Sequence, residues 1–201
     1  MTTLLEIPLN DVSSSVLHDL QIKYPNGAVL RIDVADSFAK MDEAQFWSII
    51  GLMDWRTLDS DAILARAAKA LSVFSKPDIH VFHDILNEKL YALDGRRFAE
   101  QLGSNKYVAE NSKHFSVDSF LYARCCVVAN GRVFYDTVLK NPAKMPKEYT
   151  FESLLYLPQK AWFLKTKRND YDYFPEIWSE TFSNPDGWEG IVPLKERLNL
   201  L

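Results

Sequence analysis

The chain has 201 residues, of which 47% are hydrophobic and 25% charged, and its formal net charge is −4. This balance is typical of a folded globular protein and excludes a disordered chain, while the length suits one sizeable domain with an appendage. The acidic charge argues against general binding to nucleic acid or anionic membranes, and no apolar run approaches the roughly 18 residues of a membrane helix.

The N-terminal segment, MTTLLEIPLND, has neither a cationic start nor a long apolar core, so we expect no signal peptide. The only cysteines, Cys125 and Cys126, are adjacent and close no useful loop. They predict reduced, buried thiols and a cytoplasmic protein. A vicinal disulfide switch is the alternative for this pair.

Residues 1–36 predict a small β-α-β unit that packs on the body of the protein. Two segments alternate like strands, LLEIPL and AVLRIDV, and the segment between them predicts a helix capped by Asp11 or Ser13. A right-handed crossover would make the strands parallel. Because two strands alone are only marginally stable, they need contacts from the main body or from another chain.

From about Met41 the pattern becomes helical, which predicts the main helical domain over residues 37–166. We expect Asp59 or Ser60 to cap the second helix, and Pro77 to begin the third, with Gly95 past its end. A short helix in RRFAEQLG and a polar loop follow. At helical spacing, the predicted buried residues are Phe46, Ile49, Ile50 and Met53, then Leu64, Ala67, Ala68, Leu71 and Phe74, then Ile79, Phe82, Leu86, Leu90 and Leu93.

One apolar segment, SVDSFLYARCCVVANGRVFYD, admits two structures. Asn130-Gly131 between β-branched residues is a hairpin signal, whereas Ser116 as an N-cap, with a glycine after the helix end, indicates a helix. Neither flank alternates cleanly, and a charged residue recurs at every fourth position from Arg132 to Lys140. We therefore predict two helices broken at Gly131.

Near the C-terminus, Pro158 predicts the start of a new helical segment, because the residue before a proline is biased out of the helical region. Residues 167–201 include six aromatic residues between Tyr171 and Trp188. These are too many for a solvated tail, so we expect a C-terminal wrap within the same globular unit. The expected fold class is α+β, mostly α: a bundle of about seven helices with the N-terminal β-α-β unit and the aromatic-rich wrap.

Arg124 is the main candidate for a functional residue, because apolar residues lie one helical turn before and after it. Its counter-charge should come from another element, and the acids considered are Asp84, Glu88, Glu152 and Glu180. The structural interpretation is a buried salt bridge or a clamp on backbone carbonyls. The functional alternative is a guanidinium that binds an anionic ligand or a partner carboxylate, in a cleft with Asp118, Tyr122 or Tyr135.

His80 and His83 lie three residues apart on one predicted helix, with Asp84 beside them, and could begin a metal site. His83 shares a helix face with apolar residues and no convincing third ligand is evident, so we expect a histidine at the core edge. It remains a candidate contact for a ligand or partner. We predict no bound metal and no cofactor, since the sequence also has no nucleophile elbow, phosphate-binding loop or dinucleotide fingerprint.

Seven spaced residues form a set: Ser116, Asp118, Phe120, Arg124, Gly131, Tyr135 and Pro142. As a set they resemble the signature of DUF4240, a bacterial domain family of unknown function. The segment MDEAQFWSII, with Phe46 and Trp47, is similar to the Phe-Trp helix of that family, and ALSVFSKPDIHVFHDIL is similar to its next helical hairpin. The resemblance covers at least residues 41–145 and extends through ETFSNPDGW as a longer subtype. It implies a helical fold and a bacterial source, and it brings no established activity.

From the acidic body, the missing catalytic constellation and the aromatic-rich tail, we expect a non-enzymatic protein that binds another protein, as immunity or regulatory proteins do. The alternative is a small-ligand-binding protein or an enzyme with a cleft around Arg124. No nucleic acid or membrane partner is expected, and the oligomeric state is not predicted.

Overall fold

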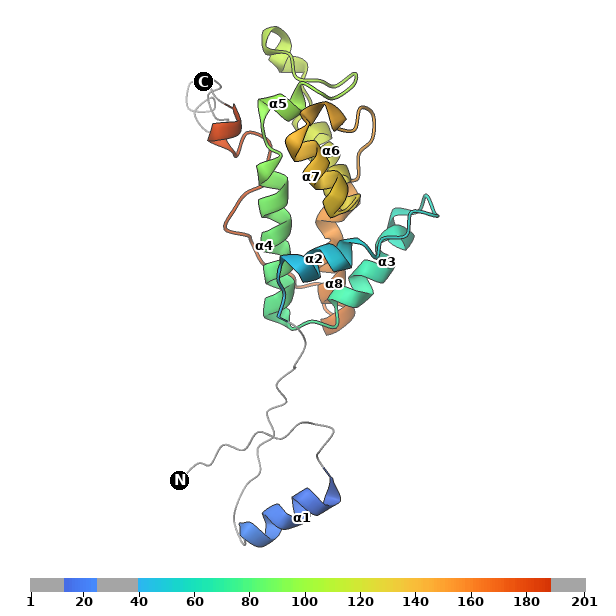
Figure 1. Ribbon diagram of the computed structural model, residues 1–201, viewed down its shortest axis with the longest axis vertical. Coiled ribbons are helices and arrows are strands. Elements are labelled where there is room, and N and C mark those ends of the chain that lie inside the picture. The colour runs from blue at the N-terminus through green and yellow to red at the C-terminus, as the bar shows by residue number, and fades with distance from the viewer. Residues whose placement is uncertain (1–12, 25–39, 189–201) are drawn as a thin grey trace. The chain divides into compact units, whose positions relative to one another are not determined.

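The computed structural model describes residues 13–24 and 40–188 (Figure 1). The chain divides into two compact units, residues 1–37 and 38–201. Within the described residues, all regular secondary structure is helical. The prediction of a mostly α fold is therefore confirmed.

The described part of the first unit is a single helix, α1 (Ser14–Lys23), and Ser13 is its N-cap residue. The hydroxyl of Ser13 accepts a hydrogen bond from the amide of Val16 at 3.4 Å, which satisfies one of the free N–H groups of the first turn. The two segments predicted as strands lie outside the described residues. The β-α-β unit is thus not supported beyond its helix, and its packing on the body stays a prediction.

Three helices open the second unit, and each begins at a polar residue whose side chain accepts a hydrogen bond from a backbone N–H of the first turn. Asp59 caps the second of these helices, as one of the two predicted alternatives, and Pro77 lies in the first turn of the third. The helices are α2 (Glu43–Ile50), α3 (Ser60–Leu71) and α4 (Lys76–Ala92).

The ambiguous apolar segment forms two helices, α6 (Val117–Ala129) and α7 (Arg132–Lys140). The hydroxyl of Ser116 accepts from the amide of Ser119 and caps α6. Gly131, with φ of +88°, separates the two helices in a conformation that glycine adopts without strain. The predicted break at this glycine is confirmed.

The prediction at Pro158 was wrong by one residue, because Leu157 already has helical angles (φ −59°, ψ −45°). A 3₁₀ turn, η4 (Glu152–Tyr156), leads directly into α8 (Leu157–Thr166). Pro158 thus lies in the first turn, where its missing N–H has no helical partner to lose. The remaining short elements are α5 (Arg96–Ala99), η2 (Ala109–His114), η3 (Pro142–Lys144) and η5 (Pro185–Trp188).

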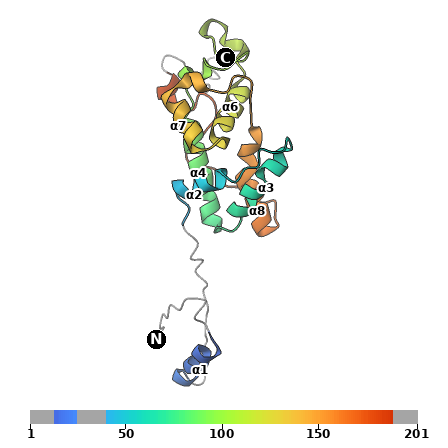
Figure 2. The same ribbon diagram turned by 45° about the vertical axis from the view of Figure 1, so that its right-hand side comes forward.

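Helix α4 is the central element of the second unit, and it packs against α2, α6 and α8. Helices α3 and α8 lie side by side (Figure 2), and α6 packs against α7 and η4. The predicted apolar faces form the core, apart from the half-buried Phe74. In the described part of the chain, no helix combines the length and the apolarity needed to cross a membrane.

Candidate functional site

Arg124 lies on α6 and is fully buried, with 0% of its side chain exposed. Its Nη1 donates a hydrogen bond to the carbonyl of Leu90 and its Nη2 to Oγ1 of Thr181, each at 3.0 Å. The guanidinium also lies 4.7 Å from the ring centre of Phe120 on the preceding turn. Burial lowers the pKa of Arg124, and the charge of Asp94 opposes that shift.

The nearest acid to Arg124 is Asp94, whose Oδ1 lies 3.9 Å from Nη1 and whose side chain is likewise 0% exposed. The expectation that Asp84, Glu88 or Glu152 supplies the neighbouring carboxylate was therefore wrong, and Glu180, the fourth acid considered, acts on Arg124 only as a weaker and more distant charge. Asp94 follows α4 in a turn before Gly95, where an acid is usually exposed. The sequence signal beside it was Gly95, which we interpreted only as the residue past the end of the helix.

Asp94 also binds the C-terminal part of the described chain. Its carboxylate accepts hydrogen bonds from the backbone amides of Phe182 (3.2 Å) and Asn184 (3.0 Å) and from Nε1 of Trp188 (2.8 Å). Thr181, which accepts from Arg124, also donates to the carbonyl of Val117 at 2.8 Å. We call these residues, Asp94, Arg124, Thr181, Asn184 and Trp188, the buried clamp.

Two glycines let the backbones meet within the buried clamp. A Cβ on Gly187 would lie 2.1 Å from the carbonyl oxygen of Asp94, and a Cβ on Gly95 would lie 3.0 Å from the carbonyl oxygen of Gly187. Side chains at these positions would force the two segments apart. The ETFSNPDGW segment is thus fixed to the end of α4 by close backbone contact as well as by hydrogen bonds.

A second cluster fixes the chain after α8 to the other half of α4. The ring of His80 stacks on Tyr173, with ring centres 4.1 Å apart, and on Trp162, with ring centres 5.4 Å apart. Nδ1 of His83 is hydrogen-bonded to the hydroxyl of Tyr171 at 3.0 Å. We call this group, with Asp84, the histidine–aromatic cluster.

Asp84 completes the histidine–aromatic cluster, because both its carboxylate oxygens accept from the hydroxyl of Tyr173 at 2.8 Å. Burial lowers the pKa of His83 to about 4, with a smaller contribution from His80. Burial and the carboxylate of Asp84 raise the pKa of Tyr173 to about 12. The two groups therefore stay neutral near pH 7, and His83 occupies the core edge as expected. In the described part of the chain, no group of three or more potential ligands could hold a metal ion.

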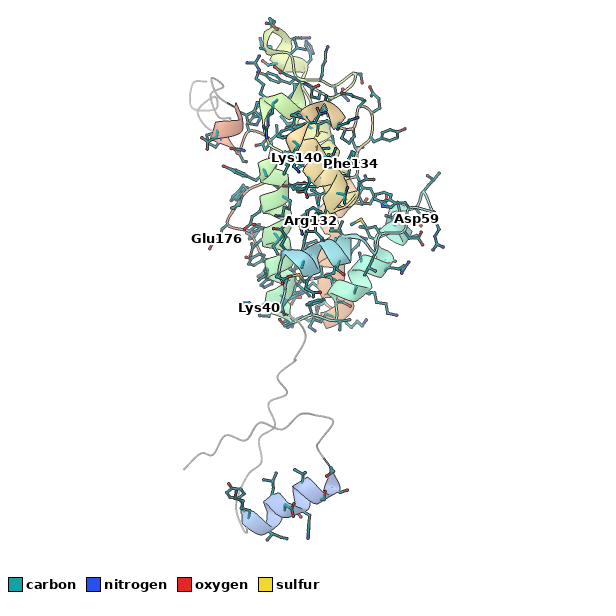
Figure 3. All side chains as sticks on the ribbon, viewed as in Figure 1. Lys40, Asp59, Arg132, Phe134, Lys140 and Glu176 are labelled. Carbon is teal, nitrogen blue, oxygen red and sulfur yellow. The ribbon has the colours of Figure 1, made fainter. Side chains whose placement is uncertain are left out.

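Between these two anchors, residues 171–180 run alongside α4 (Figure 1). We call this segment the strap. Its middle turns three apolar side chains to solvent: Phe174 is 77% exposed, Trp178 64% and Ile177 38%. The strap carries three acids, Asp172, Glu176 and Glu180, and no Lys or Arg; Glu176 lies at its outer side in Figure 3.

The five residues expected to form a site take different positions. Arg124 belongs to the buried clamp and His83 to the histidine–aromatic cluster. Tyr135 is buried and donates to the carbonyl of Lys89 at 3.2 Å. Tyr122 is half-buried, and its carbonyl accepts from the amide of Phe151. Asp118 is exposed in the first turn of α6.

Residues 41–163 match the model of the family described as "Protein of unknown function (DUF4240)". No curated protein and no solved structure matches the chain significantly. The match covers α2 to α8 almost completely and stops before the strap and η5. Arg124 and Asp94 therefore lie inside the matched region, whereas the residues that they hold directly after the strap, from Thr181 to Trp188, lie outside it.

Proposed function

Since this chain belongs to the DUF4240 family, whose description assigns no activity, we propose a function from its own surface: it is a protein-binding module that presents the strap to a partner. The observation that carries this proposal is the exposed aromatic middle of a segment whose two ends are anchored. Contiguous exposed apolar side chains of this kind are typical of interaction sites on soluble proteins.

The residue types of the strap suit a protein interface. Aromatic side chains are enriched at the centres of interfaces, and charged residues are depleted there and lie at the rim. Phe174 and Trp178 supply the aromatic anchors, and Asp172, Glu176 and Glu180 flank them. The partner that fits this surface has an apolar pocket with a cationic rim, which would also accelerate association with the acidic strap.

The anchoring of the strap favours binding energetically. Ordering a loop at an interface lowers the affinity, and a segment held in place beforehand avoids most of that loss. The histidine–aromatic cluster holds the start of the strap through Tyr171 and Tyr173, and the buried clamp holds the chain at Thr181 directly after it. In this proposal Arg124 acts by positioning the strap and does not contact the partner.

The competing hypothesis of a ligand cleft around Arg124 has no support from the geometry. The guanidinium is fully buried, and its two Nη atoms donate to protein acceptors. Arg124 lines neither the hollow between α3 and α8 nor the small hollow beside Glu148.

The test is affinity capture from the native host with the full chain as bait. The double variant F174A/W178A should lose a stoichiometric partner that the wild type retains, and the purified partner should bind the wild type alone. Y149A is the matched control, because Tyr149 is 74% exposed and lies outside the strap. Equal capture by F174A/W178A and Y149A, or no stoichiometric partner for the wild type, would refute the proposal.

A further inference from the structure

A groove of about 790 Å³ lies between α3 and α8. Ala65 and Ala68 line it from α3, and Phe163 and Leu164 line it from α8. Phe163 is 43% exposed and Leu164 39%, so their apolar surface is open to solvent. The small alanines on one wall leave room for another backbone to approach closely.

The rim of the groove is basic, although the chain as a whole is acidic. Its lining includes Lys69, Lys160 and Lys167 but only one acid, Asp61, which gives it a net charge of +2 on a chain of −4. Asp61 is bound by Lys160 at 2.8 Å. Lys69 and Lys167 form no ion pair with any residue in 13–24 or 40–188, so both remain available to an incoming acid.

The groove and the strap use different faces of α8. Trp162 stacks on His80 in the histidine–aromatic cluster, whereas the next two residues, Phe163 and Leu164, line the groove. Successive residues of a helix point about 100° apart, which separates the two surfaces. The two surfaces therefore lie on different sides of α8, and they differ in charge, because the strap carries three acids and no Lys or Arg whereas the groove lining has a net charge of +2.

We propose that this groove binds an amphipathic α-helix of a second protein, with an apolar face toward Phe163 and Leu164 and acidic side chains along its flanks. Most side chains that line the groove are exposed, so the groove is an open channel. Such a channel suits an elongated occupant better than a small molecule, which binds in an enclosed pocket. A groove lined by apolar side chains of two adjacent helices is the type of site in which amphipathic helices bind. Helix α3 has 12 residues, so the occupant spans roughly three to four turns.

The experiment measures fluorescence anisotropy of a labelled synthetic peptide of about four helical turns, with Leu on one face and Glu on the others. The full chain should bind this peptide, more weakly as the NaCl concentration rises, and should not bind the analogue with Lys in place of Glu. K69E should weaken binding about tenfold, whereas K140E, which makes the same charge change at an exposed position of α7 (Figure 3), should leave it unchanged.

Binding should also weaken in F163A, which removes apolar contact without a change in charge, and remain unchanged in F174A/W178A, which alters only the strap. Circular dichroism confirms that each variant is folded. Equal binding of the acidic and basic peptides, equal affinity of K69E and K140E, or no binding at all would overturn the proposal. A dimer in sedimentation velocity that K69E converts to monomer would also overturn it, because the occupant would then be a second copy of the chain.

Discussion

Replacing Asp94 by alanine should lower the free energy of unfolding by about 3–5 kcal/mol, because it leaves the buried guanidinium of Arg124 without its nearest counter-charge. Both side chains are 0% exposed and their nearest charged atoms are 3.9 Å apart. At that distance, an effective dielectric constant of about 20 gives an attraction of about 4 kcal/mol. D94A also removes the acceptor for three N–H donors, those of Phe182, Asn184 and Trp188.

The opposite substitution, R124M, should be less destabilising than D94A. In R124M the carboxylate of Asp94 keeps its three N–H donors, and the acceptors left without Arg124 are neutral oxygens of Leu90 and Thr181. We expect a difference of at least about 1 kcal/mol between the two variants, in line with the loss of one or two buried hydrogen bonds.

D136A is the matched control for D94A. The Arg132–Asp136 pair has nearly the same N–O distance, 3.8 Å, but its side chains are 59% and 48% exposed. An exposed pair of this kind contributes roughly 0–1 kcal/mol. The difference between D94A and D136A in the free energy of unfolding therefore reports the effect of burial at a nearly constant distance between the charges.

The assay is urea denaturation followed by far-UV circular dichroism and by tryptophan fluorescence, with the free energies compared only where the slopes agree. D94N, which keeps the shape and one acceptor oxygen, provides an intermediate value if D94A does not fold. A loss below about 1 kcal/mol in D94A, or a loss no larger than that in D136A, would refute the assignment of Asp94 as the counter-charge of Arg124.

Two further predictions concern the same anchors. Folding lowers the pKa of His83 from 6.5 to about 4. Between pH 6.5 and pH 4, the unfolded chain therefore protonates His83 more readily than the folded chain does, and protonation favours unfolding. The contribution of neutral His83 to the free energy of unfolding is fully present above pH 6.5. It should be smaller by about 2 kcal/mol at pH 5. Urea titrations at several pH values should show this decrease in the wild type and not in H83F. G187A, whose new Cβ would lie 2.1 Å from the carbonyl oxygen of Asp94, should cost about 1–3 kcal/mol and alter the near-UV dichroism of Trp188. G51A, where the backbone has φ of −64° and the nearest atom lies 3.4 Å from the new Cβ, should leave that signal unchanged, and an unaltered signal in G187A would contradict the close backbone contact.

The sequence by itself determined the local structure of the helical domain. The residues that begin helices, Asp59 and Ser116, and the glycine that separates α6 from α7 act on backbone groups within a few positions of themselves. Periodicity likewise predicted which face of α4 is buried, because the helical repeat and the apolar pattern are both local properties. The spaced signature residues also identified the family, because their types and spacing are read directly from the sequence.

Tertiary structure alone decided what Arg124 contacts. Its partners Asp94 and Thr181 lie on other segments, and Thr181 is 57 residues away in the sequence. The positive charge of Arg124 predicts that its partner is an acid, but every acid of the chain meets that condition. The packing of separate helices and loops against one another selects Asp94. The same holds for the aromatic residues between Tyr171 and Trp188, which look alike in sequence. Trp188 is 2% exposed because it reaches Asp94, whereas Trp178 is 64% exposed because it lies between the two anchors.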